Sequence, residues 1–165
     1  MAKSHFESEQ YTSESFVESA GSVLFRLSSR EISKGRRNCG ETRRETALRE
    51  VTEETGFACR LLPVNMHTRA PPAIETEQLD DRARFYTNIC EPFALQIRHL
   101  GENEVKIIWW FVAAVNEEVA PKETMEDRCM VEFYSYTDVL NKLTFQMDHD
   151  LVKKAVELVE NTYAE

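Results

Sequence analysis

Short apolar runs, separated by small, polar or turn-forming residues, predict a chain that is rich in β-strands. The longest run, residues 107–115, is apolar throughout and is typical of a buried strand, which we predict over residues 105–115. Another strand is predicted over residues 19–27. The remaining candidates are residues 57–68, with a kink at Pro63, and residues 84–89, 93–99 and 131–136. The pair Pro71-Pro72 and the acidic residues 75–81 predict a loop.

One stretch instead carries the signals of an α-helix at both of its ends. Thr42 followed by Glu45 is a capping box, and Gly56 supplies the C-terminal stop. The side that we expect to be buried carries Ala47, Leu48, Val51 and Thr55. Spaced at i, i+3 and i+4, three glutamates share the other side, namely Glu50, Glu53 and Glu54.

Two further helices are predicted near the C-terminus. Thr137 can cap a short helix over residues 138–142, and an amphipathic helix follows over residues 148–161. Its inward positions are Leu151, Val152, Ala155, Val156 and Val159. Together the elements predict an α+β fold, an α/β/α sandwich whose mixed sheet is flanked by the glutamate-bearing helix and the C-terminal helix. We expect residues 1–18 to form a flexible arm and residues 19–165 a single domain.

Charge and hydropathy argue against several classes of partner. The 165-residue chain has a net charge of −9, with the acidic excess at its two ends and a nearly neutral middle over residues 21–115. A protein that coats nucleic acid usually has a basic excess, so we expect no nucleic-acid partner. No apolar run has the length of a membrane span, so we expect no membrane partner. An anionic small molecule is compatible with the neutral middle of the chain.

The N-terminus and the cysteines give information about the cellular compartment of the protein. Residues 1–18 are rich in Ser and Glu and contain no apolar stretch, so we find no signal peptide and expect a cytoplasmic protein. A secreted protein whose signal had been removed would look the same. The four cysteines are widely spaced, which favours free thiols over a zinc site, although two disulfides stay open. They are Cys39, Cys59, Cys90 and Cys129.

Three glutamates on one helix side are unfavourable by themselves. Like charges at these spacings destabilise a helix by roughly a few tenths of a kcal/mol per pair. A solvated face, neutralised in part by Arg43, Arg44 and Arg49, is the simple structural interpretation. The surrounding residues favour a functional interpretation, because Gly35 and Gly56 stand where a tight turn and a helix stop are needed.

From Gly35 to Phe57 the sequence resembles the signature of the Nudix hydrolases. The pattern Gly-x5-Glu-x7-Arg-Glu-Val-x-Glu-Glu-x-Gly-Phe is matched at each specified position. The strand at residues 20–27, the aromatic-rich strand at 107–115 and the residues 143–145 before the last helix are also similar to that family's domain. The resemblance implies a Nudix-like α/β/α fold and a metal-dependent hydrolase that cleaves a diphosphate linked to a further group.

The resemblance also implies a metal site. Glu50, Glu53 and Glu54 would bind Mg2+ or Mn2+, and the backbone carbonyl of Lys34 would add a ligand. Hard oxygen ligands suit Mg2+, which keeps several waters and takes phosphate oxygens as further ligands. Bound metals would neutralise the pyrophosphate and lower the pKa of the attacking water. Glu50 or Glu54 would be the base, and the sequence does not choose between them.

Other motif residues would support this site. Arg49 would orient Glu53 through a charge-assisted hydrogen bond and so belongs to the catalytic set. Glu41 would anchor the loop before the helix, and the structural glycines of the motif would be Gly35 and Gly56. An additional catalytic carboxylate from a loop stays open, with Glu102, Glu104, Glu117 and Glu118 as the candidates.

The chain departs from the family pattern just before the motif. A further strand usually lies there and leads into a Leu-Pro-Lys-Gly sequence. Here only residues 28–33 separate Leu27 from Lys34, and Ser33 stands at the place of the proline. We therefore expect a basic loop over residues 28–38, with at most a short extended piece at residues 31–32. Either the sheet is trimmed at this edge or residues have been lost.

Basic residues at the helix entrance bear on the substrate. We predict that Lys34, Arg36 and Arg37 bind extra phosphates, because they would crowd the metal site. This favours inositol pyrophosphates, with dinucleoside polyphosphates close behind. A nucleoside-diphosphate-X compound, such as a nucleotide sugar or an oxidised nucleotide, is the alternative. A non-catalytic module that binds a phosphorylated ligand or a protein is the alternative of another class. The oligomeric state stays open.

Overall fold

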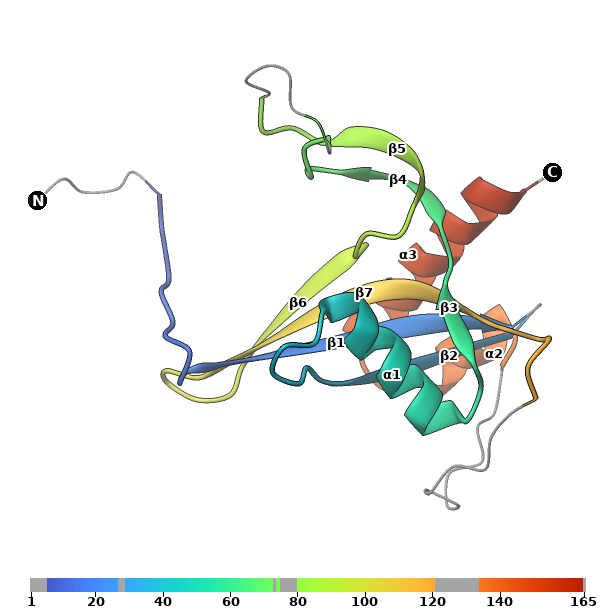
Figure 1. The fold of residues 1–165 in the computed structure, drawn as a ribbon, viewed down its shortest axis with the longest axis horizontal. Helices are drawn as coiled ribbons and strands as arrows, with labels where there is room; N and C mark the ends of the chain where they lie inside the picture. Colours follow the sequence, from blue (N-terminus) through green and yellow to red (C-terminus); the bar gives the residue numbers. More distant parts are fainter. Residues whose placement is uncertain (1–5, 27–28, 73, 75–79, 121–133, 165) are drawn as a thin grey trace, which may run out of the picture.

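The computed structural model describes residues 6–26, 29–72, 74, 80–120 and 134–164. In chain order its elements are β1 (Phe16–Arg26), β2 (Ser29–Arg36), α1 (Arg43–Thr55), β3 (Cys59–Leu61), β4 (Val64–Thr68), β5 (Arg84–Ile89), β6 (Ala94–His99), β7 (Val105–Val115), α2 (Tyr136–Lys142) and α3 (Gln146–Tyr163). The five-stranded sheet has the order β2-β1-β7-β3, and β6 also pairs with β7. Strands β4 and β5 form a separate ribbon that projects from the rest (Figure 1).

The sheet is mixed, because the long central strand β7 pairs in both directions. It runs parallel to β1 and antiparallel to β3 and β6. The predicted boundaries of β5 and β7 are confirmed, and the predicted interruption at Pro63 falls between β3 and β4. The apolar sequence of β7 suits its place, since this strand is paired on both edges and covered on both faces.

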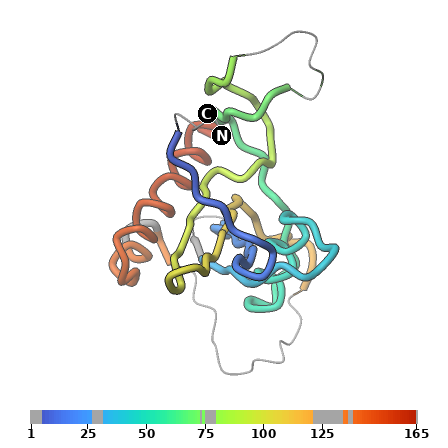
Figure 2. The backbone as a smooth tube through the Cα atoms, turned by 90° about the vertical axis from the view of Figure 1, so that its left-hand side faces the viewer, coloured from blue at the N-terminus to red at the C-terminus, as the bar shows by residue number. Residues whose placement is uncertain are grey.

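Alternation along the strands gives the sheet two apolar faces. On one face Val23, Phe25 and Val112 share a core with Val152 and Val156 of α3. The opposite face packs against α1 in two smaller clusters, one with Leu24, Ala113 and Val51 and the other with Ala20, Phe111 and Ala47. Figure 2 shows α3 and α1 on opposite sides of the strands. The predicted α+β fold with an α/β/α sandwich is therefore confirmed.

The helix α1 begins and ends where its signals predict. The Thr42 hydroxyl accepts a hydrogen bond from the Glu45 N–H, and the Glu45 carboxylate accepts one from the Thr42 N–H. Gly56 has φ 72°, in the left-handed region that glycine enters without steric cost. The buried residues of α1 are Thr46, Ala47, Val51 and Thr55, whereas the predicted Leu48 is only partly buried.

The expectation of a trimmed sheet before the motif is wrong. Residues 29–36 form the full strand β2, which pairs antiparallel with β1 from Arg26↔Ser29 to Ser19↔Arg36. The ladder thus begins at Arg26 and Ser29, which are three positions apart in the sequence, so a full strand fits before Lys34 and Gly35. Strand β1 also starts at Phe16, so three residues of the predicted arm belong to the sheet. The boundary of the domain at residue 19 otherwise stays a prediction.

The C-terminal region differs from the prediction in its details. Residues 131–133 of the predicted strand 131–136 lie outside the described residues, and Tyr136 is the first residue of α2. Ser135 caps this helix in place of the predicted Thr137, because its hydroxyl accepts a hydrogen bond from the Asp138 N–H. Helix α3 extends two residues beyond the predicted range at each end.

The remaining expectations concern the cysteines, a membrane span and the loop at residues 75–81. Within the described residues, Cys39, Cys59 and Cys90 are free thiols, and Cys129 lies outside those residues. None of the helices in the described part of the chain is long and apolar enough to cross a membrane. Of the predicted loop at residues 75–81, positions 75–79 are outside the described residues.

The close packing of β1 on its neighbours makes a prediction about Gly21. A Cβ at this position would overlap the Ser33 carbonyl oxygen and would lie 2.8 Å from the Trp110 ring. We expect Gly21→Ala to destabilise the protein by about 1–3 kcal/mol in chemical denaturation. Gly101→Ala is the matched control, since no atom lies within 4 Å of its added Cβ. Equal stabilities of the two variants would contradict this close packing of β1 on β2 and β7.

Candidate active site

A single guanidinium, that of Arg49 on α1, holds the carboxylates of the motif together. Its Nε donates to Glu41 Oε1 at 2.8 Å, and its Nη1 lies 2.7 Å from Glu50 Oε1 and 2.9 Å from Glu53 Oε2. Its Nη2 donates to the Arg36 carbonyl at 2.9 Å. These partners, with the hydrogen bond to Glu41 first, raise the pKa of Arg49. The predicted contact between Arg49 and Glu53 is thus present.

Glu41 fixes the loop that leads into α1. Its carboxylate accepts hydrogen bonds from the Asn38 N–H at 3.0 Å and from the Thr46 hydroxyl at 2.8 Å, besides those from Arg49. The hydrogen bonds from Arg49 lower the pKa of Glu41 to about 2, and those from Asn38 and Thr46 act in the same direction. Glu41 is therefore ionised at neutral pH and anchors the loop, as its place in the motif predicts.

The glutamates predicted to bind metal differ in their surroundings. The Glu50 side chain is 15% exposed and lies against Gly35, where an added Cβ would overlap its carboxylate. The absence of a side chain at Gly35 therefore makes room for Glu50 beside β2. The Glu53 side chain is 60% exposed, and Glu54 is also exposed on the same side of α1.

Glu18, which sequence analysis assigned to the flexible arm, lies at the centre of a second cluster. Its carboxylate accepts hydrogen bonds from Arg37 Nε at 2.9 Å, Arg43 Nη2 at 2.8 Å and Trp109 Nε1 at 3.1 Å. Burial raises the pKa of Glu18, but the hydrogen bonds from Arg43 and Trp109 outweigh it and lower that pKa. No local signal in the sequence places Glu18 in this cluster, because Arg37, Arg43 and Trp109 are distant from it along the chain.

The predicted substrate-binding cations separate into two groups. Arg37 pairs with Glu18 and donates to the Glu41 carbonyl at 2.8 Å, so it supports the loop from within. Lys34 and Arg36 alternate with Gly35 along β2 and therefore point to the other face of the sheet. There the Lys34 ammonium lies 5.6 Å from the centroid of the Trp110 ring. Gly21 lies between Lys34 and Trp110 in the sheet and pairs with both. Because Gly21 has no side chain, the side chains of Lys34 and Trp110 can approach each other.

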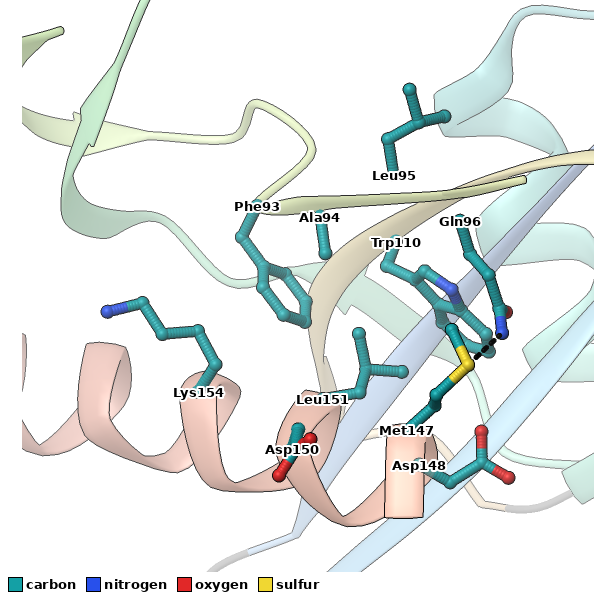
Figure 3. Close-up of a pocket in the computed structure, with 10 residues that line it drawn as sticks. All are labelled: Phe93, Ala94, Leu95, Gln96, Trp110, Met147, Asp148, Asp150, Leu151 and Lys154. Atoms are coloured by element: carbon teal, nitrogen blue, oxygen red, sulfur yellow. Dashed lines mark hydrogen bonds between the residues drawn. The ribbon is translucent and has the colours of Figure 1, made fainter. Parts of the chain in front are cut away.

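An apolar cavity of about 300 Å³ opens on the same face, between β6, β7 and the start of α3. Phe93 and Leu151 point toward each other across it, and Gln96 approaches Met147 at one side, next to the Trp110 ring (Figure 3). The carboxylate of Asp150 points away from the cavity in this view. Residues 107–115 are predicted to form a buried strand, and the nearly complete burial of Trp110 agrees with that. Its ring is also a wall of this cavity.

The carboxylates around α1 are oxygen ligands of the kind that a divalent metal ion binds. Within the described parts of the chain, no three Asp, Glu, His or Cys side chains are gathered closely enough to hold a metal ion by themselves. The oxygen donors nevertheless fit a hard cation, because Gly35 makes room for the Glu50 carboxylate and Glu53 and Glu54 follow on the same helix side. Among the candidate loop carboxylates, Glu117 pairs with Arg26 at 3.2 Å.

The comparisons with known proteins agree with this geometry. The NUDIX domain profile matches residues 20–155, and the chain belongs to that family. A NUDIX-family hydrolase from Clostridium perfringens has a similar structure, with a TM-score of 0.57 and 15% identity, covering 87% of this chain and 96% of that one. The ORF135 protein of E. coli is similar with a TM-score of 0.55 and 13% identity, covering 92% and 96%. No curated protein matches the sequence.

Family membership establishes the class of reaction. The protein is a Nudix hydrolase, an enzyme that cleaves pyrophosphate bonds in small phosphorylated substrates. Members of the family generally use divalent metal ions such as Mg2+. The structural neighbours share the fold at low sequence identity and so do not indicate a substrate.

The environment of Glu41 makes a prediction about acid stability. The pKa of this carboxyl is about 2 in the folded protein and about 4.5 when unperturbed, so the unfolded chain takes up the proton first as the pH falls. The stabilisation that Glu41 provides is therefore present above about pH 4.5 and is lost between about pH 4.5 and pH 2. Glu41→Gln should lower the free energy of unfolding at neutral pH.

The measurement is the difference in unfolding free energy between wild type and Glu41→Gln, determined by urea denaturation at several pH values. That difference should shrink as the pH falls through this window. Glu160→Gln, which changes an exposed glutamate on α3, is the control and should follow the wild type. A difference that is constant from pH 7 to pH 3 would show that these hydrogen bonds do not hold Glu41 in its ionised form.

Proposed function

We propose that this enzyme hydrolyses the pyrophosphate bond of a nucleotide, with the nucleoside in the apolar cavity and the phosphates between Lys34 and Glu50. The observation that carries this proposal is the position of two adjacent residues of β2. Lys34 reaches the Trp110 wall of the cavity, and Gly35 lies against the Glu50 carboxylate. The Lys34 side chain, which reaches a wall of the cavity, and the Glu50 carboxylate thus lie on opposite faces of the same edge strand.

The chain's own residues have distinct roles in this proposal. Glu50, Glu53 and Glu54 hold the metal, together with the backbone carbonyl of Lys34. Mg2+ or Mn2+ supplies neutralisation of the pyrophosphate and a water of lowered pKa. Arg49 holds Glu50 and Glu53 in position through its ion pairs, and either Glu50 or Glu54 accepts the proton of the attacking water.

The phosphates are bound by Lys34 and Arg36 in this proposal. Arg37 is left out of the substrate-binding set, because its guanidinium is occupied by Glu18 and by the Glu41 carbonyl. Its role is to support the loop in which the carbonyl of Arg36 meets Arg49. Lys34 and Arg36 both lie on the face of the sheet that carries the cavity.

The apolar cavity favours nucleotides over inositol pyrophosphates as candidate substrates. Inositol pyrophosphates, which the basic residues of the sequence favoured, carry phosphates around the whole ring and offer nothing to the apolar walls formed by Phe93, Leu151 and Trp110. A nucleotide offers a flat, partly apolar base at one end and anionic oxygens at the other. Dinucleoside polyphosphates and nucleoside-diphosphate-X compounds both satisfy this description, so both remain in the proposal.

The reaction is tested by comparing wild type with Glu53→Gln and Glu54→Gln. With Mg2+ present, the panel contains nucleoside triphosphates, nucleotide sugars, dinucleoside polyphosphates and inositol pyrophosphates. We expect product from the nucleotide members, and at least about a hundredfold lower kcat in both variants. Glu160→Gln should retain wild-type kcat. If wild type releases no more product than Glu53→Gln and Glu54→Gln from every panel member, the protein is a binding module instead.

The cavity is tested through Met147, which lines it and is exposed at its rim. Met147→Ala removes apolar contact area, so we expect KM for a nucleotide to rise about three- to tenfold with little change in kcat. Leu100→Ala is the matched control, because Leu100 is a similarly exposed apolar residue that does not line this cavity. Preferred cleavage of inositol pyrophosphates, with unchanged KM in Met147→Ala, would contradict the nucleotide proposal.

A further inference from the structure

Two basic residues outside the motif, Arg98 on β6 and Lys106 on β7, stand directly opposite each other in the sheet. Like charges at such a cross-strand pair are destabilising, so the pair has no evident structural benefit. Residues 96 and 98 share one face of β6, and residues 106, 108 and 110 share that face of β7. This is the face on which Lys34 and Arg36 also lie.

The four cations form one group. Burial lowers the pKa of Lys106, and the nearby charges of Lys34, Arg98 and Arg36 lower it further, whereas Glu50 raises it. Among the ion pairs of the described residues, none involves any of these four cations. Lys106 is therefore surrounded by positive charge within reach of the metal-binding glutamate. An anionic ligand would relieve the mutual repulsion of the group.

The apolar cavity is continuous with a second hollow that reaches one member of this group, Arg98. The second hollow, of about 360 Å³, extends along β6 to Arg98, and Gln96, Met147 and Asp148 line both hollows. Arg98 also donates a hydrogen bond to Gln96 at 3.3 Å. The result is one depression with an apolar end at Phe93 and Leu151 and a cationic end at Arg98.

We propose that Arg98 and Lys106, together with Lys34 and Arg36, form a polyphosphate subsite that selects nucleotides with three or more phosphates. This inference rests on the proposed function and extends it, because a nucleotide sugar has two phosphates and would leave the cationic end unfilled. Three or more phosphates form a longer anionic chain, which can contact the cations of β6 and β7 as well as those of β2. The predicted substrate is thus a nucleoside triphosphate or a dinucleoside polyphosphate.

The first arm of the test is kinetic and uses the full chain with Mg2+. We expect the double variant Arg98→Gln/Lys106→Gln to lose at least about tenfold in kcat/KM for a nucleoside triphosphate, mainly through KM. For a nucleotide sugar of the same base, kcat/KM should change less than about threefold. Lys153→Gln, which removes an exposed charge on α3, is the control and should match wild type. Equal losses on both substrates would overturn the proposed selectivity.

The second arm measures binding without turnover. Inorganic tripolyphosphate is titrated into each protein in the presence of EDTA, with calorimetric detection. We expect binding to wild type and to Lys153→Gln, and at least about tenfold weaker binding to the double variant. Unchanged binding by the double variant would overturn the subsite. If binding weakens while no nucleotide is hydrolysed by wild type, the subsite stands and the proposed function fails.

Stability separates binding from a structural role of the pair. If Arg98 and Lys106 serve a ligand, replacing them removes like-charge repulsion, so the Tm of the double variant should equal or exceed that of wild type. A pair that supports the sheet would give a lower Tm and similar losses on every substrate. That combination would also contradict the proposal.

Discussion

The neutralisation of the motif carboxylates by Arg49 is the interaction on which the rest of this site depends. Glu41, Glu50 and Glu53 are brought within hydrogen-bond distance of one guanidinium, and without it their charges would repel one another. The same side chain binds the Arg36 carbonyl, so one cation ties the end of β2 and the loop to α1. Five donors in a planar fork allow arginine to do this, whereas lysine has a single charged nitrogen.

The two faces of the sheet near Arg49 carry different groups of side chains. Successive residues of β2 point to opposite faces, so Lys34 lies beside Trp110 while Gly35 lies against Glu50. The helix side carries the carboxylates and their supporting contacts, including the cluster around Glu18. The α3 side carries the apolar cavity and the group of four cations. The edge strand β2 is therefore the place where the cationic face and the carboxylate-bearing face of the sheet adjoin.

Sequence analysis succeeded where the deciding interactions are local. Helix α1 was placed from Thr42, Glu45 and Gly56, because a capping box and a left-handed C-cap involve residues only a few positions apart. Strand β2 was missed because its sequence is mostly polar. It is held as a strand by its ladder to β1, which no local pattern reports. Arg37 was assigned to substrate for the same reason, since its partner Glu18 is distant in sequence.

The sequence by itself determined the class of enzyme and the helix that carries the glutamates, whereas their role as metal ligands stays a prediction. The class and the helix depend on spacing along one helix and its flanking turns, which is local information. Only the tertiary structure decided which cations share a face of the sheet, because Arg98 and Lys106 join Lys34 and Arg36 through strand pairing across the sheet. It also decided that an apolar cavity adjoins them, since that cavity needs strand β6 and helix α3 side by side.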